Sequence, residues 1–167
     1  MSERREAALT EAAPDLLAYF RRRIGDDDAP DQLAETLATA WRRIRVMPED
    51  PEAARRWLFG IAHHTLLNHA RGARRRHSLA GRLRGVLAAG SSAPGADDGL
   101  EVRDAIARLE PRLAELVRLV HWEGFTLAEA ADVLGVPAST ARNHYQTAKR
   151  QLRSALMPEL GCAAPVP

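Results

Sequence analysis

Residues 126–153, TLAEAADVLGVPASTARNHYQTAKRQLR, decide the fold of the C-terminal half of this chain. Thr126 is followed three residues later by Glu129, a capping-box pattern that predicts the start of a short helix. Gly135 can adopt the left-handed conformation that ends a helix, and Pro137 prevents simple continuation. A second helix then follows, so the stretch is a predicted helix-turn-helix.

The second helix of this motif has an apolar face and a polar, basic face. Ser139 or a neighbour can cap it. We expect five of its residues to point inward: Ala141, Tyr145, Ala148, Leu152 and Leu156. If the helix enters a major groove, its early outward residues can reach base edges, namely Ser139, Thr140, Arg142, Asn143 and Gln146. Lys149, Arg150 and Arg153 would meet phosphates. The alternative is a helix hairpin that only packs and whose charges are solvated.

The N-terminal half also shows helical periodicity. We expect helices at about 14–24, starting near Pro14, at 28–46, capped by Asp28, and at 51–76, capped by Asp50. In the helix at 28–46, the apolar stripe expected to face a core is Leu33, Leu37, Trp41 and Ile44. In the helix at 51–76, the residues expected to point inward are Trp57, Leu58, Ile61, Ala62, Thr65 and Leu66. The third helix also carries an outer polar stripe of His64, Asn68, Arg71 and Arg75, which by itself could be only a solvated face.

The predicted architecture is all-α, with two small helical domains joined by a flexible linker. The absence of strand-like alternation excludes a sheet, and GSSAPGADDG is typical of a linker. We place an N-terminal extension at 1–13, a first domain at 14–76, the linker at 77–100, a second domain at 101–157 and a tail at 158–167.

Composition narrows the class of protein and its compartment. The net charge is +2, but an acidic stretch around 26–35 is separated from a run of arginines at 71–84, so one surface could attract nucleic acid. Cys162 is the single cysteine, which excludes an intrachain disulfide and thiolate metal sites. No signal peptide or membrane span is visible, so we expect a cytoplasmic protein without a cofactor.

Two parts of the chain resemble the extracytoplasmic-function family of bacterial RNA polymerase sigma factors. IARLEPRLAELVRLVHWEGFTLAEAADVLG, which leads into the helix-turn-helix, is similar to the family's region 4. DAPDQLAETLATAWRR resembles region 2.2, and RRWLFGIAHHTLLNHARGARRR resembles regions 2.3 and 2.4. The matches occur in the family's order and cover most of residues 14–156.

The resemblance implies a promoter-recognition subunit. The helix at 28–46 would dock on the clamp helices of the polymerase β′ subunit, with Asp31 and Glu35 as candidate contacts. The third helix would meet the −10 element through His64, Asn68, Arg71 and Arg75 and help to hold it single-stranded. The second domain would read the −35 element and touch the β flap. An anti-sigma factor is a further expected partner.

The sequence departs from the family pattern at several positions. Ala34 stands where Gln is usual, His63-His64 where Arg-Asn is common, Asn68 where Asp is usual, and Asn143-His144-Tyr145 where Ser-Arg-Leu is frequent. These changes bear on which promoter bases are read.

Three other functions compete with this interpretation. An enzyme could use His63, His64 and His69, but their spacing does not give the i, i+4 pair of a zincin and no acidic residue accompanies them. A helix-turn-helix regulator could bind duplex DNA without polymerase. A sigma-like protein could bind polymerase or an anti-sigma factor without initiating transcription.

Overall fold

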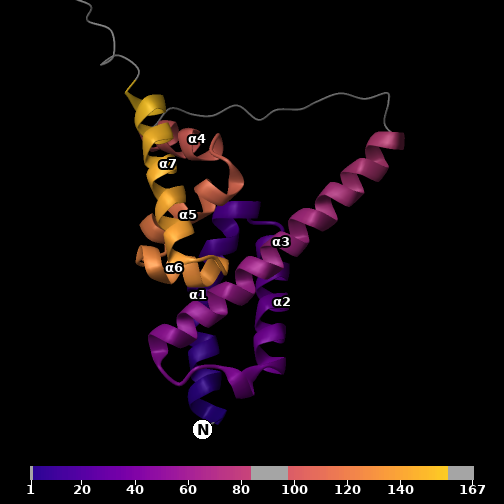
Figure 1. The fold of residues 1–167 in the computed structure, drawn as a ribbon. Helices are drawn as coiled ribbons and strands as arrows, with labels where there is room; N and C mark the ends of the chain where they lie inside the picture. The colour runs from indigo at the N-terminus through magenta and orange to yellow at the C-terminus, as the bar shows by residue number, and fades with distance from the viewer. Residues whose placement is uncertain (1, 84–97, 158–167) are drawn as a thin grey trace, which may run out of the picture. The chain divides into compact units, whose positions relative to one another are not determined.

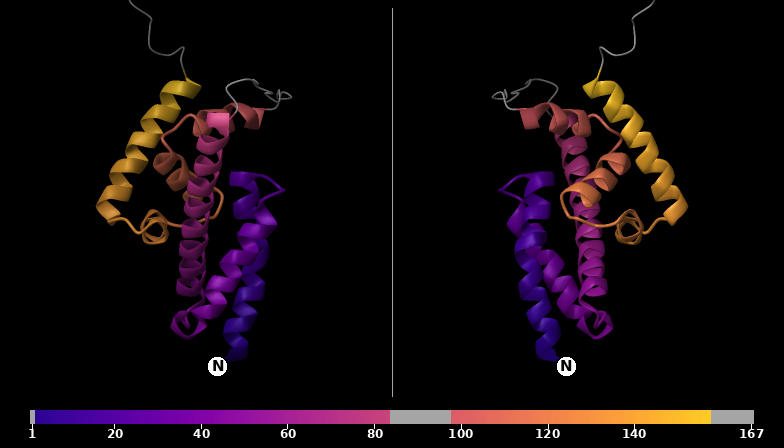
Figure 2. Two further views of the ribbon diagram at one scale, coloured as in Figure 1. Left: turned by 90° about the vertical axis from the view of Figure 1, so that its right-hand side faces the viewer. Right: turned by 90° about the vertical axis from the view of Figure 1, so that its left-hand side faces the viewer.

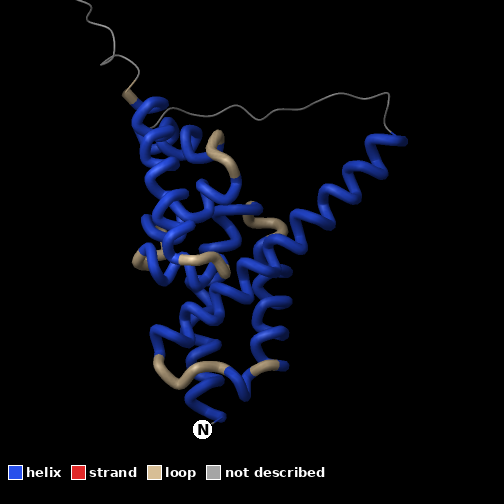
Figure 3. The backbone as a smooth tube through the Cα atoms, viewed as in Figure 1, coloured by secondary structure: helices blue, strands red, loops and turns tan. Residues whose placement is uncertain are grey.

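The computed structural model describes residues 2–83 and 98–157 of the chain, and within these ranges every regular element is helical (Figures 1 and 3). This confirms the predicted all-α fold. The helices fall into two compact units, which are described one at a time: α1, α2 and α3 pack together, and so do α4, α5 and α7. Most of the predicted linker and the whole tail with Cys162 lie outside the described residues.

Helix α1 (Ser2–Ile24) begins earlier than expected. Pro14 lies inside the helix, so the prediction of a first-turn proline is wrong. Residues 2–13 are rich in Ala, Glu and Arg, which are strong helix formers, and these outweigh the one backbone hydrogen bond that the proline removes. Leu9 is buried and anchors this early part of the helix.

Helix α2 (Ala29–Arg42) turns a different face to the core than the sequence suggested. Its buried residues are the small ones, Ala29, Thr36 and Ala40, because small side chains let two helices approach closely. Leu33, Leu37 and Ile44 are only half-buried, and Trp41 is exposed. The prediction that this stripe faces the core was therefore wrong, because the helix is rotated about its axis so that the small residues face the core instead. Asp28 precedes α2 but makes no side-chain cap, and the helix ends before a short 3₁₀ turn, η1 (Ile44–Val46).

Helix α3 (Pro51–Leu83) starts as expected and runs further. The backbone N–H of Ala53 donates to Asp50 Oδ2 at 2.8 Å, which confirms the predicted cap. Leu58, Ile61, Ala62 and Thr65 are buried as predicted, whereas Trp57 and Leu66, also expected to point inward, are only half-buried. The helix continues through 77–83, so the start of the predicted linker is helical.

The core of the first unit is aromatic. Tyr19, Phe20 and Phe59 are fully buried together with Leu16 and Leu58. The Tyr19 ring meets Phe20 and Phe59 edge-on, with centroid separations of 5.2 and 5.5 Å, a favoured arrangement of aromatic rings. This core fixes α1 against α3, and α2 packs on both helices (Figure 1).

The second unit contains α4 (Asp98–Ala107), α5 (Pro111–His121), α7 (Ala138–Leu156) and the first residues of α6 (Leu127–Leu134). Helix α7 is the longest of them, and α4 and α5 pack against it (Figure 2). One apolar cluster joins the three helices; its members are Ile106, Leu109, Leu113, Ala114, Val117, Ala148 and the half-buried Leu152. Leu156 is 39% exposed, so it does not point inward as predicted.

Candidate functional site

Helix α6 begins with the predicted reciprocal cap. The backbone N–H of Thr126 donates to Glu129 Oε2 at 2.9 Å, and the N–H of Glu129 donates to Thr126 Oγ1 at 3.3 Å. Two backbone donors that have no partner inside the helix are thereby satisfied. The predicted start of the helix-turn-helix is confirmed.

The turn after α6 is closed by backbone hydrogen bonds around Gly135. This glycine has a φ of 65°, in the left-handed region. Its N–H donates to the carbonyl of Asp132 at 3.1 Å, and the N–H of Val136 donates to the carbonyl of Ala131 at 3.0 Å. This pair of bonds is the Schellman arrangement that ends many helices. The turn therefore takes the form that the sequence predicted.

Helix α7 begins at Ala138 without a side-chain cap. The expectation that Ser139 caps it is wrong, because Ser139 already lies in the first helical turn. Pro137 takes the flanking position instead, and its carbonyl accepts from the N–H of Ala141 at 3.0 Å. Proline has a fixed φ suited to a helix start.

The outward face of α7 carries the residues predicted to touch DNA. Ala141 and Ala148 are buried on the opposite face. The exposed predicted residues are Ser139, Arg142, Asn143, Gln146, Lys149, Arg150 and Arg153, whereas Thr140 is half-buried. Arg150 donates to Thr147 Oγ1 at 3.5 Å, so one guanidinium has a partner on the same face. The helix thus presents a polar and basic surface backed by small buried residues.

Tyr145 makes a contact that the sequence did not reveal. It was expected to close a small core beside Ala141, but it is only half-buried. Its hydroxyl lies 2.8 Å from His121 Nε2 at the end of α5, and the two rings are stacked with centroids 6.0 Å apart. The two residues lie 24 positions apart, so no local spacing in the sequence links them.

In the first unit, the predicted polar stripe of α3 lies on the exposed surface. His64, Asn68, Arg71 and Arg75 are all exposed. Arg71 Nη1 donates to Asn68 Oδ1 at 3.3 Å, which holds two members of the stripe together. The side chains of Arg74 and Arg76 lie outside the described residues.

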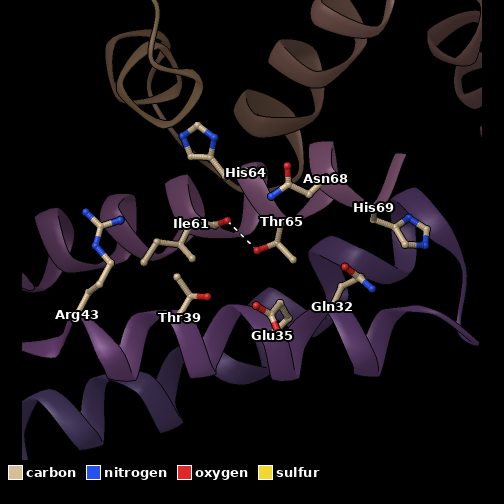
Figure 4. Close-up of a pocket in the computed structure, with 9 residues that line it drawn as sticks. All are labelled: Gln32, Glu35, Thr39, Arg43, Ile61, His64, Thr65, Asn68 and His69. Atoms are coloured by element: carbon tan, nitrogen blue, oxygen red, sulfur yellow. Dashed lines mark hydrogen bonds between the residues drawn. The ribbon is translucent and has the colours of Figure 1, made fainter. Parts of the chain in front are cut away.

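A groove of about 480 Å³ lies between α2 and α3 beside this stripe (Figure 4). It brings together Glu35, His64 and Asn68, which were predicted sites on two different helices. The remaining lining residues were not predicted: Gln32, Thr39, Arg43, Ile61, Thr65 and His69. Gln32 and Thr39 on α2 and Arg43 directly after it follow one another at helical intervals, a polar stripe that the sequence contained. The groove is polar enough to accept a hydrogen-bonding group.

A contact between a histidine and a carboxylate joins the two walls of the groove at its end. His69 Nε2 on α3 lies 3.3 Å from Asp28 Oδ2 at the start of α2. Asp28 was expected to cap α2, but its carboxylate contacts α3 instead. The pair therefore fixes the N-terminal end of α2 against α3.

The outer surface of α2 combines charge with an exposed aromatic ring. Asp31 and Glu35 are exposed, as their predicted role requires. Glu35 also lies 3.6 Å from Arg42 Nη2 on the same helix. Trp41, which precedes Arg42 in the helix, exposes 54% of its surface, so this residue belongs to the surface and not to the core as its place in the apolar stripe predicted.

Two further observations on the described residues concern metal binding and membrane insertion. Among them, no three His, Cys, Asp or Glu side chains are arranged to hold a metal ion, so His63, His64 and His69 do not converge on one. None of the described helices is both long and apolar enough to cross a bilayer.

Two family models match the chain. The model for Sigma-70 region 2 matches residues 9–76, and the model for Sigma-70, region 4, matches residues 99–152. The first match covers α2 and most of α1 and α3, and the second covers the helix-turn-helix.

The chain is similar to curated sigma factors. It is 31% identical over 165 residues to the ECF RNA polymerase sigma factor SigL of Mycobacterium tuberculosis, with 93% of each chain covered. It is 30% identical over 140 residues to an RNA polymerase sigma-C factor of Mycobacterium bovis, covering 81% of this chain and 75% of that protein.

Two solved structures share its fold. Sigma factor RpoE of Bartonella quintana, solved with the anti-sigma factor NepR, aligns with a TM-score of 0.66 and 22% identity, covering 92% of this chain and 97% of that one. CnrH, solved with the cytosolic domain of CnrY, aligns with a TM-score of 0.59 and 20% identity, covering 93% and 96%.

Proposed function

Because the chain belongs to the extracytoplasmic-function family of RNA polymerase sigma factors, which direct transcription initiation, we propose a division of this task among three of its helices. Helix α7 reads the −35 element, α3 holds the −10 element, and α2 binds core polymerase. The corresponding domains are residues 14–76 and 101–157.

The exposed polar face of α7 is the observation that carries the −35 assignment. Arg142 and Asn143 lie near the N-terminal end of the helix, where a recognition helix contacts base edges. Lys149, Arg150 and Arg153 follow further along and would bind phosphates, which position a protein without reading sequence. Apolar residues on the opposite face hold the helix in place.

The −10 assignment rests on the α3 stripe and the groove beside it. Arg71 and Arg75 offer positive charge for a strand's phosphates. His64 and Asn68 line the groove, and polar residues of both α2 and α3 line the rest of it. A base turned out of the melted strand would find hydrogen-bonding partners there, which supports a role in keeping the element single-stranded.

Core polymerase binding is assigned to the outer face of α2. By resemblance to the family, this face meets the clamp helices of β′, and the second domain meets the β flap. Asp31 and Glu35 supply charge, and the exposed Trp41 supplies apolar area that a partner can bury. A mixture of this kind is typical of protein interfaces, where aromatic residues often provide much of the binding energy.

An anti-sigma factor is the second protein partner that we propose. The sigma factor RpoE of Bartonella quintana, which has the same fold, was solved with the anti-sigma factor NepR. A partner that covers the polymerase-binding surface would keep the chain inactive. RNA synthesis itself belongs to the polymerase, so we assign no catalytic step to this chain. We propose that it works in the cytoplasm, where the polymerase is.

Run-off transcription tests the proposal. Sigma-free bacterial core polymerase is incubated with a genomic fragment library, with and without the protein. We expect transcripts that start downstream of a shared pair of spaced elements. DNA binding by the protein alone, without such transcripts, would instead support an independent regulator, and neither activity would support a sigma-like protein that does not initiate.

A further inference from the structure

Tyr145 and His121 form a tether between α5 and α7, two helices of the second unit. The Tyr145 hydroxyl and His121 Nε2 are 2.8 Å apart, and their rings stack with an interplanar angle of 19°. A hydrogen bond and a stacked ring pair both depend on direction. Together they restrict the rotation of α7 more closely than an apolar contact at the same place would.

The tether lies on the edge of α7 that faces the proposed DNA-binding surface. Tyr145 follows Arg142 by three residues and precedes Lys149 by four, so the three side chains are neighbours on one helix face. Lys149 Nζ lies 6.0 Å from the centre of the Tyr145 ring, at the outer limit of a cation–π contact. The pair therefore supports one proposed base-reading residue and one proposed phosphate contact.

The apolar cluster of the second unit does not provide this support by itself. The members of this cluster on α7 are Ala148 and Leu152, whereas the proposed base-reading residues lie between Ser139 and Gln146, where Ala141 is also buried. Ala141 offers only a methyl group to packing, so the directional contact described in this part of α7 is the one between Tyr145 and His121.

We infer that His121 is a positioning residue for −35 recognition, which acts through Tyr145 to hold the Arg142–Lys149 edge of α7 in register with the DNA. His121 does not itself read a base. This inference rests on the proposed role of α7.

The test compares holoenzymes that contain the full chain or its variants. Each is titrated onto a promoter duplex recovered in the run-off selection and onto the same duplex with its −35 element scrambled. The measured quantity is the ratio of the two affinities. Tyr145→Phe keeps the ring but removes the hydroxyl, and His121→Phe keeps an aromatic ring but removes the ring nitrogens. Trp122→Phe is the matched control beside His121.

We expect Tyr145→Phe and His121→Phe each to reduce the ratio about three- to tenfold, the effect of one lost hydrogen bond. The double variant should be no worse than either single variant, because both remove the same interaction. His121→Gln, which keeps a hydrogen-bonding side chain, should recover part of the ratio, and Trp122→Phe should leave it unchanged.

Four outcomes would overturn the inference. A lower active fraction or thermal midpoint with an unchanged ratio would show a structural role only. Additive losses in the double variant would show that the two residues act separately. If the wild-type holoenzyme did not distinguish the two duplexes, the proposed role of α7 would fail, and the inference with it; a wild-type ratio that the variants leave intact would remove the inference alone.

Discussion

Ala40 and Trp41 are adjacent on α2 but lie in opposite environments: Ala40 is fully buried, whereas Trp41 exposes 54% of its surface. The small residue lets α2 approach its neighbours, which leaves the large one outside. An exposed tryptophan has much apolar area to lose to a partner. It lies on α2, the helix that we assign to polymerase binding, and precedes Arg42, whose Nη2 lies 3.6 Å from Glu35 Oε1.

Trp41→Ala should therefore weaken binding to core polymerase about tenfold or more, as truncation of an aromatic interface residue commonly does. The affinity of each variant is measured by its competition with a labelled sigma factor for core polymerase. Leu67→Ala removes another exposed apolar side chain, on α3, and should have little effect on core affinity. Equal affinity of wild type and Trp41→Ala would remove Trp41 from the interface.

Loss of the capping box should destabilise the second unit. Thr126→Ala removes the acceptor for the N–H of Glu129 and should lower the free energy of unfolding by about 1 kcal/mol. Urea denaturation followed by circular dichroism measures the change. Thr126→Ser retains a hydroxyl and should remain close to wild type; an equal loss in both variants would show that the cap does not account for the effect.

The glycine of the turn should be sensitive to any side chain. Gly135→Ala places a Cβ on a residue with a φ of 65°, which costs about 1–2 kcal/mol. No neighbouring atom lies within 4 Å of the added Cβ, so backbone conformation alone should cause the loss. Gly135→Asn should cost less, because Asn tolerates this conformation better. Thermal unfolding of both variants tests whether Gly135→Ala loses more stability than Gly135→Asn. A Gly135→Ala variant as stable as wild type would contradict the prediction.

Arg142 and Lys149 should differ in what they contribute to DNA binding. Arg142→Ala should relax the preference for one base of the −35 element, at a cost of about 1–3 kcal/mol on the preferred sequence. Lys149→Ala should weaken binding to all sequences alike and lower the slope of log affinity against log salt by about one. Holoenzyme titrations on single-base promoter variants at several salt concentrations separate the two. Identical effects would show that readout and positioning are wrongly assigned.

Arg71 and Arg75 should act in promoter opening. Replacing both with Ala removes two exposed cations from the proposed path of the melted strand. We expect a lower yield of open complex, detected by permanganate reactivity of unpaired thymines, with a smaller change in closed-complex formation. Arg21→Ala and Arg22→Ala together remove two exposed cations from α1 and serve as the control. An unchanged open-complex yield would contradict the role of the stripe.

The sequence by itself determined the features that depend on neighbouring residues. The Thr126–Glu129 cap, the turn at Gly135 and the Asp50 cap before Pro51 each involve atoms a few residues apart, so their residue types and spacing are sufficient to predict them. The resemblance of the two halves to one family could likewise be identified from the sequence motifs and their order along the chain.

Tertiary structure decided the features that depend on packing between helices. Periodicity located α2 but could not choose between its small-residue face and its large-residue face, because both repeat at helical intervals; contact with α1 and α3 selected the small residues and exposed Trp41. The α2–α3 groove and the His121–Tyr145 tether join residues far apart in the chain. Such contacts follow from the distance and rotation between packed helices, which no local spacing specifies.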